Sequence, residues 1–332
     1  MVDCPVTIII PVRNRRELIT RCLDSVLAQT WRSLRIIVVD NGSSDGTGDA
    51  VLRWVSENGV RLEGDCSAVG GNSVTKPGRT LLLLKEDKPG ASAARNRAVD
   101  EIVGEHVIFF DSDDEMMPTL VEEAMNAIGD ADLVYWQGEV VGLDGGVTLK
   151  PFHTGNLLRR QFYNGMLATQ LYMLSTRFLR NKLKNDGSSG EETPLWEERA
   201  SVWNDWELGI RIALARPKVV ALPKKLVRIH AQAESITGRR FSDREGEWEN
   251  TLDIVEKKIQ GLPEESRLLD MVDYRSAILA AHYDREGNHP GAKALLSRAL
   301  SRAGRPSWRR LLLRLLYRYT ASGGRGAYYL WR

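Results

Sequence analysis

The chain has 332 residues, of which 42% are hydrophobic and 27% are charged, and its formal net charge is +2. A chain of this size can bury a large core, and we expect one sizeable domain plus an appendage. So small a net charge excludes any argument for nucleic-acid binding from total charge alone. Three scattered cysteines, Cys4, Cys22 and Cys66, show neither disulfide nor metal-site spacing, which favours a reducing compartment.

The sequence enters a strand pattern at Val6 without a basic leader. No later window has the ~18 uninterrupted apolar residues that a membrane-spanning helix needs. We therefore expect a cytoplasmic protein.

The first half of the chain repeats a unit of strand, polar loop and helix. Apolar runs typical of buried strands cover residues 6–11, 34–39, 81–84 and 107–110. The segments between them carry helical patterns; Ile19, Leu23 and Val26, for example, share one apolar face. Strands alternating with helices imply right-handed crossovers, so we predict an α/β fold with a mainly parallel sheet.

Polar residues follow each of these strands, at 11–14, 40–45, 90–96 and 111–114. Ligands of such sheets bind outside the carboxyl ends of the strands, so we expect one ligand-binding edge. Asp40 can accept hydrogen bonds from ribose or nucleoside donors, and Gly42 and Gly46 allow close backbone turns. The residues alone leave alternatives open, because a Gly/Ser/Asp loop is also typical of a plain helix cap and Arg95 is either a diphosphate ligand or a solvated helix residue.

Residues 107–115 (VIFFDSDDE) are an apolar run that ends in a cluster of acids. An unalternating apolar run is typical of a strand covered on both faces. Closely packed like charges raise one another's pKa unless a cation offsets them, and oxygen ligands suit Mg²⁺ or Mn²⁺. The alternative is an acidic turn that caps the helix starting near Pro118.

Four ordered motifs together resemble the family 2 glycosyltransferases of the GT-A fold. They are VTIIIPVRN at 6–14, VVDNGSSDGT at 38–47, ARN at 94–96 and FDSDD at 110–114, and the resemblance extends over about residues 6–235. It implies a nucleotide-sugar donor, a divalent metal and transfer with inversion. Residues 60–80 depart from it, because this connection is longer than usual in the family; we interpret it as a surface insertion, either over the donor cleft or a plain loop.

The resemblance also implies roles for single residues. Pro11 and Asp40 match positions that hold the nucleoside, and Asp111 with Asp113 matches the Asp-x-Asp motif for metal and diphosphate. Residues 227–230 (VRIH) resemble the stretch that closes these domains over the diphosphate, with His230 as a third metal ligand or a phosphate donor, or as a satisfied histidine without either role. The predicted nucleotide-sugar-binding residues are Pro11, Val12, Arg13, Asn14, Asp40, Ser43, Arg95, Asp111, Ser112 and Arg228, and the predicted metal ligands are Asp111, Asp113 and His230.

The acceptor half is predicted from residue 119 to residue 240. We expect a helix at 120–128, strands at 132–136, 140–149 and 168–174, and a polar loop at 185–192 near the acceptor. Residues 203–208 (WNDWEL) open a helix and resemble the family's Glu-Asp motif, with Asn204 in place of the glutamate. The resemblance implies that Asp205 is the catalytic base; Glu207 is the fallback, and an N-cap aspartate is the alternative.

Residues 241–332 show helical patterns only, including a hairpin around residues 287–291, and we predict a separate C-terminal helical region. Its basic tail has one predicted apolar face, formed by Trp308, Leu311, Leu312, Leu315, Leu316 and Tyr319. Such a face either lies on the anionic inner surface of the cell membrane or packs on the preceding hairpin.

The leading functional hypothesis is an inverting, metal-dependent glycosyltransferase with Mn²⁺ or Mg²⁺. Its donor is expected to be a UDP-sugar, and its acceptor a glycan or a lipid-linked precursor of cell-surface polysaccharide. The rival hypothesis is a nucleic-acid or membrane-binding module that uses the basic tail. The clustered acids argue against nucleic acid, and we expect none as a partner.

Overall fold

The computed structural model describes residues 5–63, 78–184, 194–232, 240–302 and 306–324. Several predictions concern residues outside these ranges: Cys4, Cys66, most of the 60–80 insertion and the acceptor loop at 185–192. Cys22 is described, and it is a buried free thiol, as the scattered cysteines predict.

The strands are β1 (Val6–Val12), β2 (Leu34–Asp40), β3 (Arg61–Leu62), β4 (Arg79–Lys85), β5 (His106–Phe109), β6 (Glu115–Met116), β7 (Leu133–Val141), β8 (Val147–Leu149), β9 (Tyr172–Ser175) and β10 (Val219–His230). The α-helices are α1 (Arg16–Leu27), α2 (Thr47–Asn58), α3 (Ala91–Val99), α4 (Leu120–Ile128), α5 (Leu157–Asn164), α6 (Thr176–Phe178), α7 (Asn204–Leu214), α8 (Glu247–Ile259), α9 (Glu265–Arg285), α10 (His289–Ser301) and α11 (Ser307–Ala321). Shorter helical turns are η2 (Thr169–Leu171), η3 (Leu179–Lys184) and η4 (Phe241–Arg244).

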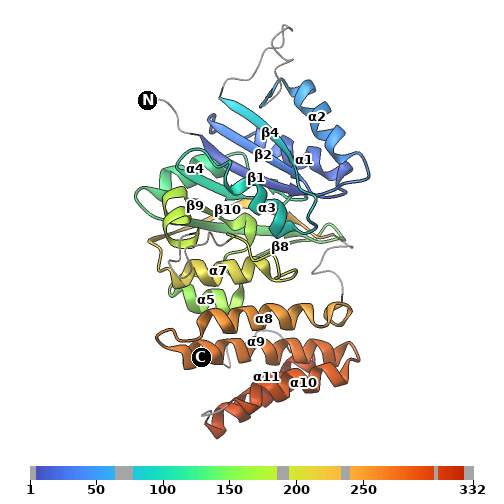
Figure 1. Ribbon diagram of the computed structural model, residues 1–332, viewed down its shortest axis with the longest axis vertical. Helices are drawn as coiled ribbons and strands as arrows, with labels where there is room; N and C mark the ends of the chain where they lie inside the picture. The colour runs from blue at the N-terminus through green and yellow to red at the C-terminus, as the bar shows by residue number, and fades with distance from the viewer. Residues whose placement is uncertain (1–4, 64–77, 185–193, 233–239, 303–305, 325–332) are drawn as a thin grey trace. The chain divides into compact units, whose positions relative to one another are not determined.

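The chain divides into two compact units. The first comprises residues 1–155, 166–198 and 211–231, and the second comprises residues 156–165, 199–210 and 232–332. The first unit contains the whole sheet (Figure 1). The second contains α5, the start of α7 and all helices from α8 onward.

The sheet of the first unit has the strand order β3-β4-β2-β1-β5-β9-β7-β10-β6, with β8 paired to β7. Strands β3, β4, β2, β1 and β5 run parallel, as do β7 and β10, whereas β9 is antiparallel to both of its neighbours. The predicted α/β fold with a mainly parallel sheet is therefore confirmed. The chain leaves β1 toward β2 and β4 and returns to β5 on its other side, so the sheet has a switch point between β1 and β5, where ligands of such sheets bind.

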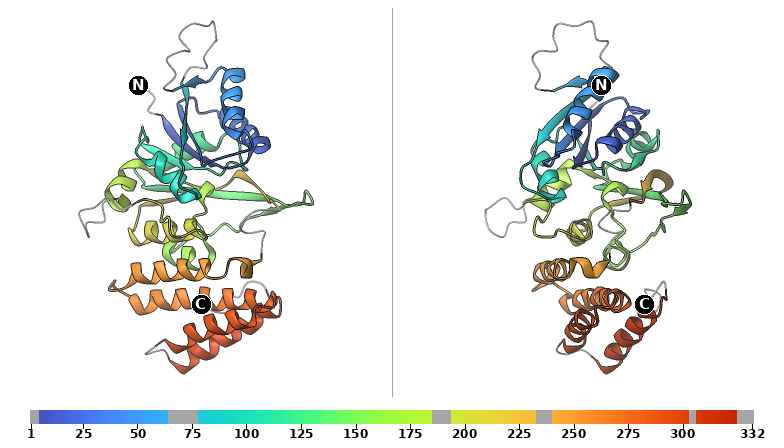
Figure 2. Two further views of the ribbon diagram at one scale, coloured as in Figure 1. Left: turned by 45° about the vertical axis from the view of Figure 1, so that its right-hand side comes forward. Right: turned by 90° about the vertical axis from the view of Figure 1, so that its right-hand side faces the viewer.

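Alternate residues of the central strands face different helices. Ile8 and Ile10 share a core with residues of α1, α2 and α4, and α3 contacts β1, β2 and β4 outside that core. In Figure 2, α1 (blue) and α3 (teal) lie on opposite sides of the strands. Covering both faces explains why β1 is buried along its whole length and why its sequence shows no alternation.

The structure corrects three details of the predicted strands. A two-residue strand, β3, lies within the stretch interpreted as an insertion. Strand β7 continues through the boundary predicted at residue 140, and it is followed by a turn in which Gly142 N donates to Gly146 O. The strand predicted at 168–174 begins only at Tyr172, after the turn η2, because residues 169–171 form a 3₁₀ turn instead.

The second unit is helical, as predicted for the C-terminal region. Its longest helix, α9, contacts α5, α8, α10 and α11. The predicted apolar face of the tail is divided: Leu316 is fully buried with Leu313 against residues of α9 and α10, whereas Leu311 and Leu315 are exposed. The six residues lie on one side of α11, as their spacing predicts, but one edge of that side is packed and the other is exposed.

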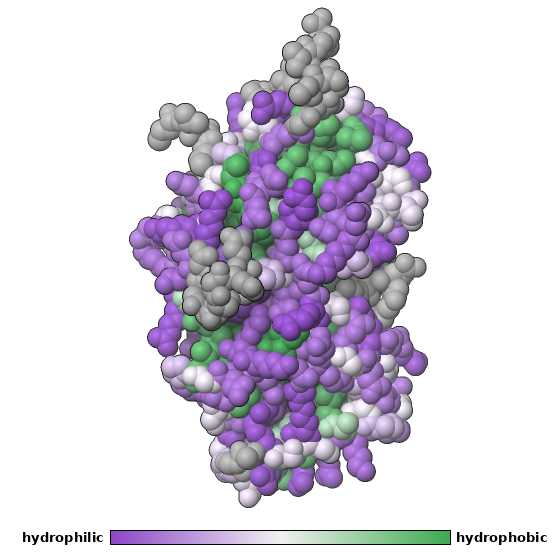
Figure 3. Space-filling view, viewed as in Figure 1, coloured by the Kyte–Doolittle hydropathy of each residue, from purple (hydrophilic) through white to green (hydrophobic). Residues whose placement is uncertain are grey.

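The face drawn in Figure 3 is mainly hydrophilic, with apolar residues (green) visible over the end of the sheet that carries β2 and β4. Strand β4 is only partly buried along most of its length, since its outer neighbour β3 has two residues. No helix in the described part of the chain is long and apolar enough to cross a membrane.

Candidate active site

The loops after β1 and β2 are joined by hydrogen bonds at the carboxyl edge of the sheet. Asn14 has a left-handed backbone (φ 50°), donates its backbone N–H to Ser43 Oγ (3.0 Å) and accepts from Ser44 N at its Oδ1 (2.8 Å). Arg13 is exposed beside this junction, whereas the side chain of Val12 is buried in the core. Asn14 and Ser43 therefore shape the edge by holding two loops together.

Asp40 lies at the end of β2 and is 9% exposed. Its Oδ1 accepts a hydrogen bond from Ser43 N (2.9 Å), and a Cβ on Gly48 would lie 3.1 Å from its Oδ2. A side chain at position 48 would therefore crowd this carboxylate. The next residue, Asn41, accepts from Gly90 N and donates to the carbonyl of Lys88, which ties the loop before α3 to the same edge.

Arg95 of α3 lies directly beside Asp111, at the switch point. Its Nη2 donates to Asp111 Oδ1 at 2.7 Å, and its guanidinium lies 4.4 Å from the centre of the Trp196 ring. The side chain is 5% exposed, yet Nε and Nη1 have no hydrogen-bond partner among the residues that the structure describes. Nε and Nη1 carry three N–H groups between them, and buried donors without partners are rare in folded proteins, so these groups suit an anionic ligand.

The segment that carries Trp196 is held against α3 by the residue after Arg95. Asn96 Nδ2 donates to Trp196 O (2.9 Å), and Trp196 N donates to Asn96 Oδ1 (2.8 Å). The Trp196 ring is fully buried and makes an edge contact with Phe109 of β5. Trp196 thus fixes the plane of the Arg95 guanidinium between the sheet and the acidic loop.

The acids after β5 lie close together in a largely buried loop. Burial and the charge of Asp111 raise the pKa of Asp113, and burial with the charges of Asp111 and Asp113 raises the pKa of Asp114 to about 8. Asp114 is 2% exposed and accepts from Gln170 Nε2 and His230 N, each at 2.9 Å. Asp114 therefore holds the end of β10 beside the acidic loop.

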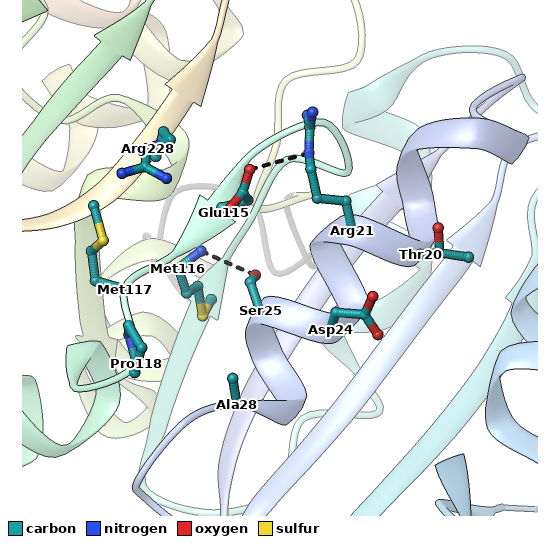
Figure 4. A pocket seen from close by; sticks show the side chains of 10 residues that line it. All are labelled: Thr20, Arg21, Asp24, Ser25, Ala28, Glu115, Met116, Met117, Pro118 and Arg228. Atoms are coloured by element: carbon teal, nitrogen blue, oxygen red, sulfur yellow. Dashed lines mark hydrogen bonds and ion pairs between the residues drawn. The ribbon is translucent and has the colours of Figure 1, made fainter. Parts of the chain in front are cut away.

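His230 pairs with Glu115. Its Nε2 lies 2.6 Å from Glu115 Oε1, which Arg21 Nε approaches at 3.3 Å. Glu115 and Arg21 also line a pocket of about 450 Å³ between α1 and β6, together with Arg228 (Figure 4). The Arg228 side chain is 40% exposed, and its Nε forms an ion pair with Glu139 Oε1 at 2.9 Å. The carboxylate of Glu139 therefore already balances the charge of Arg228.

The donor set fits a hard divalent cation at two carboxylates. Burial is the largest cause of the raised pKa values of Asp113 and Asp114, and neighbouring negative charge raises them further; a metal ion at Asp111 and Asp113 would offset that charge. Within the residues described, no three His, Cys, Asp or Glu side chains gather closely enough to hold a metal, so His230 is not grouped with the two aspartates. Mg²⁺ and Mn²⁺ commonly take one or two carboxylates and complete their shell with phosphate and water.

Asp205, the predicted base, belongs to the second unit at the first turn of α7. Its Oδ1 accepts from Trp206 N at 2.8 Å. The Trp206 indole donates to Phe162 O of α5, and both tryptophans of this turn, Trp203 and Trp206, lie about 5 Å from the buried guanidinium of Arg275 (5.1 and 5.0 Å). The packing of Trp203 and Trp206 against Arg275 therefore fixes the turn that carries Asp205.

Glu207, the fallback base, is in a different environment. Its side chain is fully buried and forms an ion pair with Lys258 Nζ of α8 at 2.9 Å. The carboxylate of Glu207 is thus held by its counterion, Lys258.

Sequence reasoning left out four residues that shape these sites. Asp114 and Glu115 belong to the acidic motif, and an excess of acids over the two metal ligands was a signal for supporting roles. Trp196 and Arg275 carry no local signal, because each acts through partners far away in the chain. The structure brings Arg95 and Asp111 together, holds Asn14 to Ser43, and buries Pro11 and Ser112 at the same edge.

A mainly parallel sheet with an Asp-Asn-Gly-Ser loop after β2 and an Asp-Ser-Asp motif after β5 is the arrangement of a glycosyltransferase domain of the GT-A class. The sequence profile described as "Glycosyl transferase family 2" matches residues 7–185, more than half of the chain, and the chain belongs to this family. The family resemblance seen in the motifs is therefore confirmed.

Curated relatives agree with this assignment. The uncharacterized glycosyltransferase YibD of Escherichia coli is 31% identical over 127 residues, which are 38% of this chain and 31% of the relative. Glycosyltransferase GlyA of Streptococcus pneumoniae is 32% identical over 122 residues, which are 37% of this chain and 15% of the relative. The chain thus matches less than a third of the length of these two proteins.

Solved structures share the fold at low sequence identity. S. aureus TarS 1–349 has a TM-score of 0.63 and 18% identity, over 96% of this chain and 87% of the other. Mannosyltransferase PcManGT from Pyrobaculum calidifontis, solved with GDP-Man and Mn²⁺, has a TM-score of 0.57 and 19% identity, over 98% of this chain and 85% of the other. At these identities the likeness extends to the fold.

Proposed function

We propose that this chain transfers a sugar, with inversion, from a UDP-sugar to a glycan or lipid-linked acceptor in cell-surface polysaccharide synthesis, on the cytoplasmic side of the membrane. The observation that carries the proposal is Arg95, a nearly buried arginine with two unpartnered nitrogens, beside the Asp111–Asp113 motif at the switch point of the sheet. A guanidinium next to a carboxylate metal site suits a nucleoside diphosphate, which needs both a fork of donors and a cation.

The donor contacts follow from the edge of the sheet. Asp40 accepts hydrogen bonds from the base or ribose through the oxygen that faces Gly48. The loop residues Pro11, Arg13 and Asn14 border the same site, and Arg95 donates to the diphosphate. Asp111 and Asp113 would hold Mn²⁺ or Mg²⁺, which when bound would supply Lewis-acid stabilisation of the departing diphosphate.

Transfer then needs one proton acceptor. As the acceptor oxygen forms its bond to the anomeric carbon, the bond from that carbon to the diphosphate breaks and its electron pair leaves with the diphosphate. Asp205 takes the proton of the attacking hydroxyl, as a general base does. The role of His230 as a third metal ligand or a phosphate donor stays a prediction. In the structure its Nε2 is hydrogen-bonded to Glu115, and it would have to leave this partner to bind a metal or a phosphate through that nitrogen.

The names of related proteins support the donor and acceptor classes. TarS 1–349, with 19% identity, has been solved in complex with UDP-GlcNAc. A Campylobacter jejuni relative, 22% identical over 196 residues, is a beta-1,3-glucosyltransferase named for a GalNAc(5)-diNAcBac-PP-undecaprenol acceptor, a lipid-linked glycan. Neither match identifies the sugar that this chain transfers.

Isothermal titration with a panel of nucleotides tests the proposal, with and without Mn²⁺, followed by a screen of nucleotide sugars for donor hydrolysis. We expect metal-dependent binding of UDP and turnover of a UDP-sugar. Binding of oligonucleotides alone, weakening steeply with salt, would favour the rival binding module. Tight UDP binding by Arg95→Ala would contradict the assigned role of this arginine.

A further inference from the structure

The helix α11 is only half covered by the second unit. Leu313 and Leu316 are fully buried in a cluster with Tyr274 of α9 and Ala299 of α10. Thr320 continues this packed side one turn further on. Among the described residues, the helix is thus anchored by one face, and exposed side chains on another face can make contacts without unfolding the unit.

A second face of α11 exposes large apolar side chains in a row. Trp308, Leu311, Leu315 and Tyr319 have exposed fractions of 59%, 56%, 50% and 41%. Their spacing of three, four and four residues puts them on one side of the helix, along about 16 Å at 1.5 Å per residue. Single exposed apolar residues are normal on a protein surface, but a contiguous row indicates an interaction site.

A row of arginines lies beside this apolar row. Arg310, Arg314 and Arg318 repeat every four residues, and Arg314 and Arg318 are exposed. The sequence contains no aspartate or glutamate after Glu286. Among the described residues, Arg309 is ion-paired to Asp270, whereas the structure gives no ion pair for the three arginines of the row.

We propose that α11 seats the second unit on an anionic phospholipid bilayer, with the apolar row at the boundary of headgroups and acyl chains and the arginine row on lipid phosphates. An apolar stripe flanked by arginines is the pattern of helices that lie in the membrane interface. The charge of the row favours this partner over a second copy of the chain. In an antiparallel pairing of two copies through the apolar row, the arginines of one would lie beside those of the other and repel them.

The test uses the full chain and flotation with vesicles of 30% phosphatidylglycerol in phosphatidylcholine, compared with pure phosphatidylcholine. Leu311→Ser with Leu315→Ser removes the centre of the apolar row, and Arg314→Gln with Arg318→Gln removes two charges. Matched controls are Leu143→Ser with Leu149→Ser, which are exposed apolar residues of the first unit, and Arg53→Gln with Lys225→Gln, which are exposed cations there.

We expect the wild-type chain and both controls to bind the anionic vesicles alike. The arginine variant should bind about 30-fold less tightly, from about 1 kcal/mol per charge near the surface, and the leucine variant at least about tenfold less tightly. Thermal unfolding and donor hydrolysis should be unchanged, because the replaced side chains are exposed on α11. Equal binding to neutral vesicles, or unchanged binding by the leucine variant, would overturn the proposal. A wild-type oligomer that the leucine variant dissociates would overturn it in favour of a second copy.

Discussion

Replacing Asp205 with asparagine separates catalysis from folding in this protein. Asparagine keeps an oxygen in the place of Oδ1, which accepts from Trp206 N at 2.8 Å, and so preserves the first turn of α7. We expect the free energy of unfolding to fall by about 1 kcal/mol, because asparagine removes the negative charge that acts on the buried guanidinium of Arg275. What the variant loses is the ability to take a proton.

The expected loss of transfer is about 10² to 10⁴-fold, the usual size of a general-base contribution, or about 2.7 to 5.4 kcal/mol of barrier. Donor affinity should stay within about twofold, because the base acts on the acceptor hydroxyl. Transfer rates at saturating donor, isothermal titration with UDP and urea unfolding measure the three quantities. Near-normal transfer in Asp205→Asn would refute the assignment.

The matched variant is Glu207→Gln, two residues away on the same helix. Its carboxylate is fully buried and pairs with Lys258 Nζ at 2.9 Å, whereas Lys258 is 32% exposed. Removing the charge should destabilise the protein by about 1 to 3 kcal/mol, less than for a fully buried pair because Lys258 reaches water. Transfer by the folded variant should stay near normal. A loss of transfer in folded Glu207→Gln as large as in Asp205→Asn would move the base to Glu207.

Three further variants test other parts of the structure. Asp113→Ala should lower turnover by about 10³-fold or more, as chelation should, because the leaving group loses Lewis-acid stabilisation; full activity in chelator would contradict this. Asn96→Ala breaks two hydrogen bonds to Trp196 and should weaken UDP binding by up to about 30-fold, at about 1 kcal/mol per bond; unchanged affinity by titration would refute the clamp on Arg95. Arg302→Met leaves the buried Asp273 without this counterion and should lower unfolding free energy by about 3 kcal/mol, measured in urea.

The repeated strand–helix units and the Asp-Ser-Asp motif after β5 were predictable from the sequence. Strand and helix formation here follow local apolar spacing, which is written in consecutive residues. Burial of β1 on both faces explains its unbroken run of apolar residues. The order of four motifs placed the candidate donor residues on one edge, since parallel strands end on the same side of a sheet.

The partners of those residues depended on packing between distant segments. His230 was expected near a metal or phosphate, but Glu115, 115 residues earlier, bonds to its Nε2. Trp196 lies under Arg95 because Asn96 binds its backbone from 100 residues away. Such contacts form only when several elements have closed around them, so no local pattern reports them.

The tail shows the same division within one helix. Its periodicity correctly predicted an amphipathic helix, because the spacing of Trp308, Leu311, Leu315 and Tyr319 is a local property of the sequence. Which leucines enter the core was decided by the surface that α9 and α10 present: Leu316 is fully buried, whereas the adjacent Leu315 is 50% exposed. Apolar spacing defines a helix face, but burial depends on the neighbour that the folded chain brings to it.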